Sequence, residues 1–210
     1  MNIYRFLLYY VQYIMEFVEP IRDPKKISQI KNMLRWENRI RDLLMFELWI
    51  NSALRISDLL SIKVSDLFNV NNEIYESFTL KEQKTGKNNK IAITPKVKET
   101  LKLYASTYKG VIENQDNYIF FHSKRFPLGK DNIWRWVAWK MINDICHSIW
   151  LKWSYGWHTL RKTWWYQARM QWIPLEIIQL KLNHSNLAVT KRYLWITYDE
   201  VEKAMLKLDL

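Results

Sequence analysis

The stretch ALRISDLLSIKVSDL, residues 53–67, decides how the fold is interpreted. Its arginine, Arg55, stands between two apolar residues, which favours a guanidinium held by buried neighbours over a solvated charge. The planar donors of a guanidinium suit the oxygens of a phosphate. Ser57 or Asp58 can then cap a short helix that reaches Leu60. The stretch therefore predicts a helix start beside a cation that is held in place.

Helical patterns precede and follow this stretch. Residues Asp23–Trp36 contain an early proline and carry apolar residues at helical spacing, and Ile40–Leu48 form a second apolar stripe. Farther along the chain, the expected helices are Pro95–Tyr108, Asp131–Ile149, Thr159–Met170, Pro174–Leu182 and Asp199–Leu208. The chain is therefore expected to be mainly helical.

One strand region interrupts the helical pattern. Ile74–Lys81 and Lys90–Thr94 alternate or run apolar, and the residues KTGK, 84–87, supply the turn between them. Phe120–His122 is typical of a short buried strand or a connector. Because no internal repeat, low-complexity run or Ser/Gly linker occurs, the predicted fold class is α+β: one mainly α-helical domain with a small antiparallel β-sheet.

Composition bounds the class of partner. Of the 210 residues, 49% are hydrophobic, which is enough to bury a core. Lys and Arg outnumber Asp and Glu by 32 to 21, and the net charge of +11 favours a polyanionic partner, either nucleic acid or an anionic membrane surface. The single cysteine, Cys146, cannot form an internal disulfide; it indicates a reducing cytosol and is expected in the core.

The N-terminal residues 1–17, MNIYRFLLYYVQYIMEF, are apolar and aromatic. No small-residue cleavage site follows, and the run is too short and interrupted to span a membrane. We expect residues 1–16 to be an extension or a peripheral helix, with a natural start at Met15 as the second interpretation, and residues 17–210 to be the functional domain. No membrane partner is expected.

Three further segments carry residues suited to phosphate chemistry. Lys84 lies at the hairpin tip, where it either enters a cleft or simply adds surface charge. His158 and Arg161 in HTLR are three residues apart, which places an imidazole and a guanidinium on one helix face. Tyr193 follows His184 by nine residues. A phenolate beside cations is a competent nucleophile, although a tyrosine in such a helix is most often part of the core.

The order of these residues is more specific than any one of them. Together they resemble the catalytic set of the tyrosine recombinase, or phage integrase, family: Arg55, Lys84, His158, Arg161, His184 and Tyr193. The surrounding words ALRISDLLSIKVSDL, EQKTGK, HTLRKT and LNHSNLAVTKRYL match as well. The resemblance runs from about Phe17 to the C-terminus and implies the catalytic-domain fold of DNA breaking-rejoining enzymes.

The resemblance implies a nucleophile and a phosphate clamp. Tyr193 would attack a scissile phosphate, forming a 3′-phosphotyrosyl link and releasing a 5′-hydroxyl. Arg55 and Arg161 would hold the non-bridging oxygens, whose negative charge grows in the transition state. The implied function is therefore site-specific recombination or integration of DNA.

The other three residues would move protons and bind the phosphate. Lys84 would protonate the leaving 5′-oxygen, His158 would assist proton transfer from the nucleophile, and His184 would donate a hydrogen bond to the phosphate. No metal or nucleotide cofactor is expected, since the covalent link conserves the energy of the broken phosphodiester and the sequence lacks a Gly-rich phosphate loop and clustered carboxylates for Mg²⁺. The implied partner is double-stranded DNA, bound by a homo-oligomer, a tetramer on paired sites.

The chain departs from the family pattern at its N-terminus. Integrases commonly carry an N-terminal helical domain that clamps the far side of the duplex, and the residues before the catalytic pattern are too few for it. The chain therefore resembles the shorter, single-domain members. Without a clamp, DNA affinity is expected to be weak and sensitive to salt.

A second departure concerns glycine and tryptophan. The chain has 4 Gly and 12 Trp, and several tryptophans stand where resembling family members typically have glycine: Trp49, Trp150, Trp165, Trp172 and Trp195. Trp172 follows an apparent helix end, a natural position for glycine. Either the protein is an aromatic-rich variant, or UGA codons that specify glycine have been read as tryptophan. In the second case the indoles would overpack sites made for glycine.

Two other functions fit parts of the pattern. A type IB topoisomerase-like enzyme would use the same tyrosine chemistry to relax DNA, although the KTGK turn and the LNHS segment favour a recombinase. A DNA-binding module that keeps the fold without the chemistry belongs to a different class, either a regulator or a decayed fragment. The intact set of six catalytic residue types argues against decay.

Overall fold

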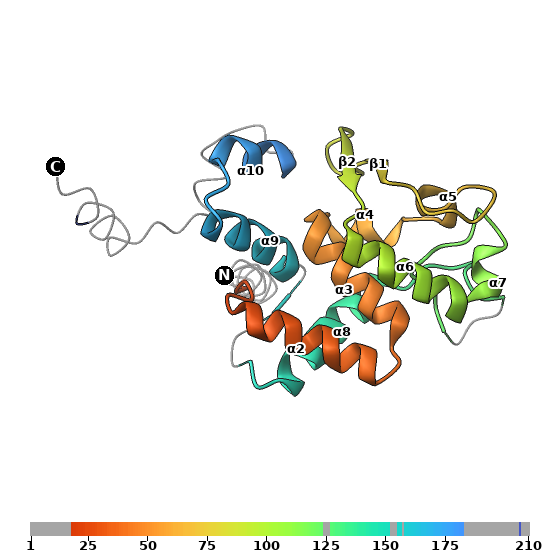
Figure 1. Ribbon diagram of the computed structural model, residues 1–210, viewed down its shortest axis with the longest axis horizontal. Coiled ribbons are helices and arrows are strands. Elements are labelled where there is room, and N and C mark those ends of the chain that lie inside the picture. Colours follow the sequence, from red (N-terminus) through yellow and green to blue (C-terminus); the bar gives the residue numbers. More distant parts are fainter. Residues whose placement is uncertain (1–17, 124–126, 152–154, 157, 183–205, 207–210) are drawn as a thin grey trace, which may run out of the picture.

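The computed structural model describes residues 18–123, 127–151, 155–156, 158–182 and 206. Figure 1 labels the helices and strands of these residues. In chain order they are α2 (Pro24–Trp36), α3 (Ile40–Ser52), α4 (Ile56–Leu60), α5 (Val64–Leu67), β1 (Ser77–Lys81), β2 (Asn88–Ala92), α6 (Pro95–Thr107), α7 (Lys109–Ile112), α8 (Arg135–Ser148), α9 (Thr159–Met170) and α10 (Leu175–Lys181). Most of these elements are helices, and the two strands form an antiparallel sheet. The predicted fold class is confirmed.

Helix α3 forms the centre of the core. Residues 42–50 are all buried, and the helix packs against α2, α6 and α9. Its buried carboxylate, Glu47, accepts a hydrogen bond from Thr100 Oγ1 of α6 at 2.6 Å and lies 3.4 Å from Lys31 Nζ of α2. A buried carboxylate with two such partners is compensated for the water it loses. Helix α3 is therefore packed on several sides, which fixes the position of its C-terminal end and of the residues that follow.

The starts of two helices follow their sequence signals. Pro24 is the first residue of α2, and the Asp23 side chain accepts a backbone N–H of the first turn at 2.8 Å. Pro95 begins α6 in the same way, with Thr94 accepting a first-turn N–H at 3.4 Å. The first backbone N–H groups of a helix have no partner within the helix. Proline at this position has no N–H to satisfy, and the capping oxygen accepts one of the other N–H groups of the first turn.

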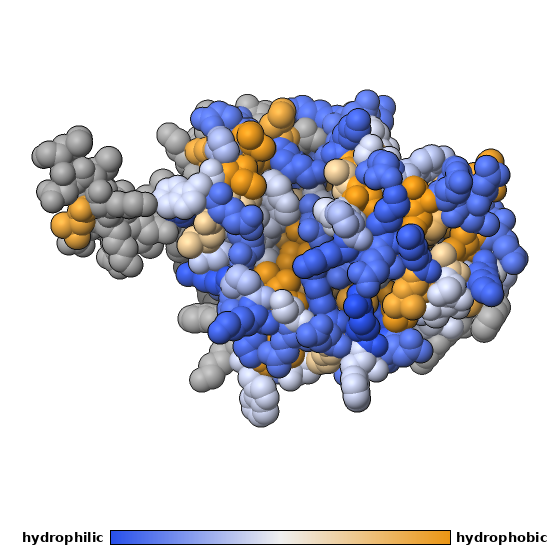
Figure 2. Space-filling view, viewed as in Figure 1, coloured by the Kyte–Doolittle hydropathy of each residue, from blue (hydrophilic) through white to orange (hydrophobic). Residues whose placement is uncertain are grey.

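Helix α10 lies beside α9 at one end of the molecule (Figure 1). Its Ile178 is buried in a small cluster with Trp165, Ala168 and Leu182. Ile177 and Leu180 of the same helix are instead 54% and 78% exposed. Figure 2 shows hydrophobic side chains at the surface over α10, among hydrophilic ones. An apolar face of this kind is suited to contact another chain or another segment.

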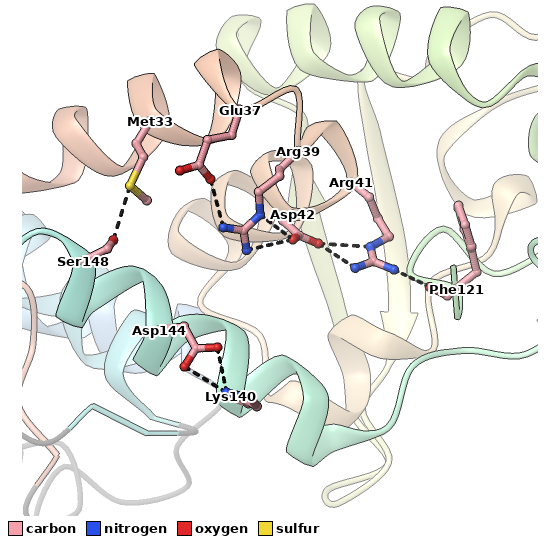
Figure 3. A network of polar contacts seen from close by, with 9 residues as sticks. All are labelled: Met33, Glu37, Arg39, Arg41, Asp42, Phe121, Lys140, Asp144 and Ser148. Carbon is pink, nitrogen blue, oxygen red and sulfur yellow. Dashed lines mark hydrogen bonds and ion pairs between the residues drawn. The ribbon is translucent and has the colours of Figure 1, made fainter. Parts of the chain in front are cut away.

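A chain of polar contacts fixes the start of α3, as Figure 3 shows. The Asp42 carboxylate lies 3.0 Å from Arg39 Nη2 and 2.8 Å from Arg41 Nη2. Arg41 Nη1 donates in turn to the carbonyl of Phe121 at 2.7 Å. Phe121 is buried and forms an isolated antiparallel bridge with Asn132. The segment expected as a short buried strand or connector is therefore a buried connector that anchors α3.

Helix α8 begins later than the predicted residue Asp131. It starts at Arg135, because Asn132 takes part in the bridge just described and donates from Nδ2 to the carbonyl of Leu60 at 3.1 Å. These contacts hold the preceding residues outside the helix. Cys146 of α8 is fully buried, and this burial raises the pKa of its thiol to about 12. Its predicted place in the core is confirmed.

The hairpin is shorter than the sequence pattern suggested. Strand β1 begins three residues later than predicted, and β2 begins and ends two residues earlier. The Glu82 N–H donates to the carbonyl of Lys87 at 2.9 Å and closes the turn there, so pairing resumes at once after it. Antiparallel pairing then runs from Lys81 opposite Asn88 to Ser77 opposite Ala92.

Residues 18–22 lie against α9. Lys162 Nζ donates to the carbonyl of Val18 at 2.9 Å, and the Ile21 N–H donates to Thr163 Oγ1 at 2.9 Å. Helix α9 is thus covered on one side by the chain that precedes α2. The expected extension, residues 1–16, lies outside the described residues. None of the described helices combines the length and the apolar composition needed to cross a membrane.

Two tryptophans occupy left-handed positions at helix ends. Trp150 follows the end of α8 and Trp172 the end of α9, with φ of 60° and 61°. In both places the residue after the tryptophan donates its N–H to the carbonyl five residues earlier, at 3.1 Å. This pair of features is the helix ending that favours glycine, because a Cβ is strained at positive φ. Both indoles are exposed, at 87% and 83%.

Two other tryptophans singled out in the sequence lie in the core. Trp49 is fully buried, and its Nε1 donates to the carbonyl of Leu54 at 3.0 Å. Trp165 is 5% exposed, and its Nε1 has no hydrogen-bond partner among the described residues. Trp195 lies outside the described residues. The helix ends at 150 and 172 therefore have the backbone of a glycine site, whereas positions 49 and 165 accommodate an indole.

Candidate active site

Arg161 lies in the first turn of α9 and connects three segments of the chain. Its side chain donates from Nη1 to the carbonyl of Ala53 at 2.5 Å and from Nη2 to the carbonyl of Leu182 at 2.6 Å. Ala53 follows α3 in the left-handed conformation, with φ of 54°, and Leu182 follows α10. Arg161 itself is only 7% exposed. The backbone of two helix ends therefore fixes the plane of this guanidinium.

Arg55 lies next to the same junction, two residues beyond Ala53. It immediately precedes α4, and its neighbours Leu54 and Ile56 are buried, as the sequence predicted. Its side chain is 18% exposed, and Nη1 donates to Glu82 Oε2 at 2.5 Å. A hydrogen bond between two ionised groups is stronger than a neutral one. A carboxylate from the hairpin therefore holds this second guanidinium.

The capping predicted for Ser57 or Asp58 is wrong. Helix α4 begins at Ile56, and no side chain caps it. Asp58 is 1% exposed and accepts the backbone N–H of Gln83 at 2.9 Å, while the Gln83 side chain donates to the carbonyl of Ser57 at 3.3 Å. The buried carboxylate takes its donor from the hairpin, so these contacts join α4 to the residue that precedes Lys84.

Lys84 is exposed on the turn of the hairpin. The turn is closed by the Glu82 N–H bonded to the carbonyl of Lys87 at 2.9 Å and by the Gly86 N–H bonded to the carbonyl of Glu82 at 2.8 Å. Gly86 has φ of 66°, which glycine adopts without steric cost. With Gln83 bound to α4 as well, the lysine side chain extends from a backbone that is fixed before and after it.

His158 directly precedes α9. Desolvation and then the charges around it lower its pKa to about 4. Those charges belong to Arg161, Lys162, Arg55 and Lys84. The residue keeps an exposed surface. The lowered pKa keeps the imidazole neutral at pH 7, in a region where nearby charges are positive.

Three charged residues near this group were not predicted as site residues. Glu82 is buried at the end of β1, and Asp58 is buried in α4. Lys181 at the end of α10 donates from Nζ to Asn89 Oδ1 at 3.3 Å and to the carbonyl of Lys90 at 3.4 Å. The spacing of Asp58 three residues after Arg55 could have suggested that the two charges lie near each other. Glu82 continues the alternation of Phe78 and Leu80, the inward residues of β1, so the period of two could have suggested that it faces inward.

Burial shifts the pKa values of two of these groups. Desolvation raises the pKa of Asp58, against the hydrogen bond from Gln83 and the nearby charges of Arg55 and Arg161. Desolvation lowers the pKa of Lys181, and the charge of Arg161 acts in the same direction. Lys181 and Arg161 are thus close enough to repel each other. The cationic region therefore extends from the hairpin to the end of α10.

The remaining two predicted residues, His184 and Tyr193, lie outside the described residues. His184 follows, by two positions in the sequence, the Leu182 carbonyl that Arg161 binds. The structure therefore gathers four of the six predicted residues and fixes the chain just before the fifth. Among the described residues, no three His, Cys, Asp or Glu side chains are grouped so that they could hold a metal ion.

The described part of the site is suited to a tetrahedral anion. It offers two guanidiniums, an exposed ammonium and a neutral imidazole, which come from the start of α4, the hairpin, the residue before α9 and α9 itself. Guanidiniums hold anionic oxygens through paired donors, an ammonium can give a proton, and a neutral imidazole can take one. The arrangement can therefore bind a phosphodiester and serve proton transfer beside it.

Comparisons with known proteins agree with this chemistry. Residues 23–200 match the model of the phage integrase family. The protein named "Probable integrase/recombinase YoeC" of Bacillus subtilis (strain 168) is 33% identical over 190 residues, which cover 90% of this chain and 96% of that one. Tyrosine recombinase XerA of Pyrococcus horikoshii is 25% identical over 89% of this chain and 62% of its own length.

Solved structures show the same fold. The crystal structure of XerH site-specific recombinase bound to palindromic difH substrate, a post-cleavage complex, superposes with a TM-score of 0.72 at 15% identity. The match covers 92% of this chain and 53% of that one, so this chain spans about half the length of that recombinase. The family match over most of the chain and the likeness of fold agree, and the chain belongs to the phage integrase family of tyrosine recombinases.

Proposed function

We propose that the chain is a site-specific recombinase or integrase that cuts and rejoins DNA through a 3′-phosphotyrosyl intermediate on Tyr193, without a metal or nucleotide cofactor. The observation that carries the proposal is a pair of contacts between distant segments. Arg161 binds the carbonyl of Ala53, two residues before Arg55, and Arg55 binds Glu82, two residues before Lys84. The family match adds to it, since the relatives named above are recombinases.

In the first step, the Tyr193 oxygen attacks the phosphorus of the scissile phosphodiester. The new bond joins phosphorus to the phenolic oxygen, and the bond to the 5′-oxygen of the next nucleotide breaks. Arg55 and Arg161 bind the non-bridging oxygens, where negative charge increases in the transition state. Their fixed guanidiniums are already oriented before DNA arrives, which is the condition for strong stabilisation of that charge.

Protons move at both ends of the reacting phosphate. Lys84 gives a proton to the leaving 5′-oxygen, and its exposed position on the turn allows it to reach the DNA. His158, neutral at pH 7, takes the proton of the Tyr193 hydroxyl directly or through water. His184 donates a hydrogen bond to the phosphate. In the rejoining step a 5′-hydroxyl attacks the phosphotyrosyl link, and the same groups act in reverse.

The partner is double-stranded DNA, bound by several copies of the chain. The net charge of +11 favours a polyanion, and the structure similar to this one is a recombinase bound to its DNA substrate. We propose a tetramer on paired DNA sites, with the exposed Ile177 and Leu180 of α10 in contact with a neighbouring copy. The cytoplasm is the proposed location, in keeping with the unpaired Cys146.

A nicked suicide substrate tests the proposal. Such a duplex loses a short 5′-hydroxyl fragment after cleavage, so the covalent protein–DNA adduct accumulates and appears as a slower band on a denaturing gel. We expect an adduct with the unmodified chain across a panel of candidate sites, and none with Tyr193→Phe. Tyr75→Phe is the matched control, because Tyr75 is a partly exposed tyrosine outside the site and should leave the adduct unchanged.

Three outcomes would contradict the proposal. DNA binding without any adduct on the whole panel would indicate a binding module that lacks the chemistry. An adduct that persists in Tyr193→Phe would place the nucleophile elsewhere. Relaxation of supercoiled DNA without exchange of strands between two sites would instead identify a topoisomerase.

A further inference from the structure

Glu82 is a buried carboxylate between two of the proposed catalytic residues. Its side chain has no exposed surface, and it directly follows β1, two residues before Lys84. Removing an ionised carboxylate from water is unfavourable unless charged or polar donors replace the lost solvent. The donors that surround Glu82 therefore show which groups stabilise its charge and which groups it can position.

Within the part of the chain that the structure describes, the side chains of Arg55, Thr85 and Asn89 donate to the two oxygens of Glu82. Arg55 Nη1 lies 2.5 Å and Thr85 Oγ1 2.7 Å from Oε2, while Asn89 Nδ2 lies 2.9 Å from Oε1. These donors come from the start of α4, from the turn and from β2. The carboxylate is therefore the point at which Arg55 is joined to the hairpin.

The backbone of Glu82 also shapes the turn that carries Lys84. Its N–H and its carbonyl both form the hydrogen bonds that close the turn, at 2.9 Å and 2.8 Å. The bond from Thr85 Oγ1 to the Glu82 side chain spans the same turn from within. A change in the Glu82 carboxylate would therefore move two cations at once: the guanidinium bound to it and the ammonium on its turn.

The second oxygen of Glu82 leads toward the other arginine. Asn89, which donates to Oε1, accepts from Lys181 Nζ of α10 at 3.3 Å. Helix α10 is followed by Leu182, whose carbonyl binds Arg161. A continuous set of polar contacts thus runs from Arg55 through Glu82 and Asn89 to the helix end that positions Arg161.

We propose that Glu82 is a positioning residue that orients Arg55 and Lys84 together for cleavage of the phosphodiester; the inference rests on the proposed function. Glu82 would not touch the DNA. Its effect would pass through the two cations: Arg55, which binds the phosphate, and Lys84, which protonates the leaving oxygen. The Glu82→Gln variant keeps the size of the side chain and removes the charge, so it isolates this effect.

A substrate with sulfur in place of the bridging 5′-oxygen separates the two roles. A thiolate leaves without being protonated, so cleavage of this DNA does not need Lys84 in place. It still needs the guanidinium of Arg55 on the non-bridging oxygens. The amount of activity that sulfur restores therefore measures how much of a defect passes through Lys84, and the part that remains passes through Arg55.

We expect Glu82→Gln to slow adduct formation on ordinary nicked DNA by about 100-fold, as loss of an oriented general acid does. DNA binding should change by less than about 3-fold, since no phosphate contact is removed. On the sulfur substrate the defect of Glu82→Gln should shrink from about 100-fold to about 10-fold, and the remaining defect is the part that passes through Arg55. Lys84→Ala should be restored almost completely by sulfur, and Arg55→Ala should not be restored. Glu76→Gln is the matched control, because Glu76 is an exposed carboxylate paired with Lys98 outside the site.

Thr85 supplies a second test that does not alter the carboxylate. Thr85→Val preserves shape and removes the hydroxyl that binds Glu82, so we expect cleavage about 10-fold slower and full restoration by sulfur. Thr85→Ser keeps the hydroxyl and should cleave at the normal rate.

Wild-type rates in Glu82→Gln, or no restoration by sulfur in either variant, would overturn the inference. An unmodified chain that forms no adduct would instead sink the proposed function. If Glu82→Gln does not unfold cooperatively, the variant is not properly folded, and the comparison of Thr85→Val with Thr85→Ser tests the inference instead.

Discussion

The two arginines of the site are held in different ways. Arg161 binds two backbone carbonyls at helix ends and is 7% exposed. Arg55 binds one buried carboxylate, Glu82, and its side chain is 18% exposed. The first guanidinium is fixed by the path of the main chain, the second by a single side chain from the hairpin.

The two kinds of anchoring predict different effects on folding stability and on cleavage. Arg161 satisfies carbonyls of Ala53 and Leu182 that are buried with it, so the junction of α3, α9 and α10 depends on it even without DNA. Arg55 and Glu82 form an ion pair within a smaller unit, the hairpin and the start of α4. A fault at Arg161 should therefore affect folding and cleavage, whereas a fault at Arg55 should affect mainly cleavage.

Replacing each arginine by lysine tests most directly whether the two kinds of anchoring differ. Lysine keeps the charge but cannot offer a planar fork, so we expect cleavage to fall by about 100-fold or more in both variants. Arg161→Lys should also lower the free energy of unfolding by about 1–3 kcal/mol, because one ammonium cannot serve both carbonyls. Arg55→Lys should change it by less than about 1 kcal/mol, since an ammonium can still pair with Glu82.

Adduct formation on nicked DNA and urea denaturation measure the two effects. DNA affinity should change by only a few-fold in either variant, because both arginines act mainly on the charge that develops during cleavage. Equal losses of stability in the two variants would show that backbone and side-chain anchoring are equivalent here. Equal losses of binding and cleavage would contradict the assigned roles.

His158 reports on the charges of both arginines. Its pKa of about 4 in the free protein reflects desolvation and the surrounding cations. A bound phosphodiester would add negative charge among those cations, so we expect the pKa to rise toward its ordinary value of about 6.5. NMR titration of the imidazole C–H signals with and without DNA measures the change, and His158→Asn assigns the signal by its absence.

The same pKa fixes the sign of a pH effect on stability. The folded-state pKa of His158 lies below the unfolded value of about 6.5, so the unfolded chain binds the extra proton between the two values. The stabilisation is complete above pH 6.5 and declines as the pH falls toward 4. In His158→Asn this decline should be smaller. Titration of His158 near pH 6.5 in the free protein would mean that the cations are not gathered around it.

Sequence periodicity predicted the longer helices and missed what contacts decide. Helix α2 and α6 follow their proline and capping signals to within a residue at each end. The four-residue helices α5 and α7 are too short for a periodic signal. The start of α8 was placed too early, because the bridge of Phe121 with Asn132 joins segments that no local pattern connects.

The sequence suggested candidate site residues but not the side chains that hold them. The order of motifs suggested Arg55, Lys84, His158 and Arg161, and their catalytic roles stay predictions. His184 and Tyr193 stay predictions, since they lie outside the described residues. Asp58 was predicted as a helix cap and binds the hairpin instead. Glu82 and Lys181 went unnoticed because the pairing of the hairpin with α4 and α10 arises only in three dimensions.

The turn between α9 and α10 offers the finest test of backbone anchoring. Trp172 lies in this turn with φ of 61°, between the helix of Arg161 and the helix end that Arg161 binds. A left-handed residue with a Cβ is strained by roughly 1–2 kcal/mol, and part of the gain from glycine is offset by its freedom in the unfolded chain. We expect Trp172→Gly to raise the free energy of unfolding by about 1 kcal/mol and to leave cleavage unimpaired.

Trp150→Gly should behave in the same way, because α8 ends with the same hydrogen bonds. The matched control is Trp36→Gly: this tryptophan is 91% exposed but lies within the last turn of α2, where glycine should cost up to about 1 kcal/mol. A loss of stability at 172 and 150 as well would show that the indoles are not strained. The codons give an independent check, because UGA at both positions would make glycine the natural residue of a backbone already shaped for it, whereas UGG would mean that the chain tolerates the strain.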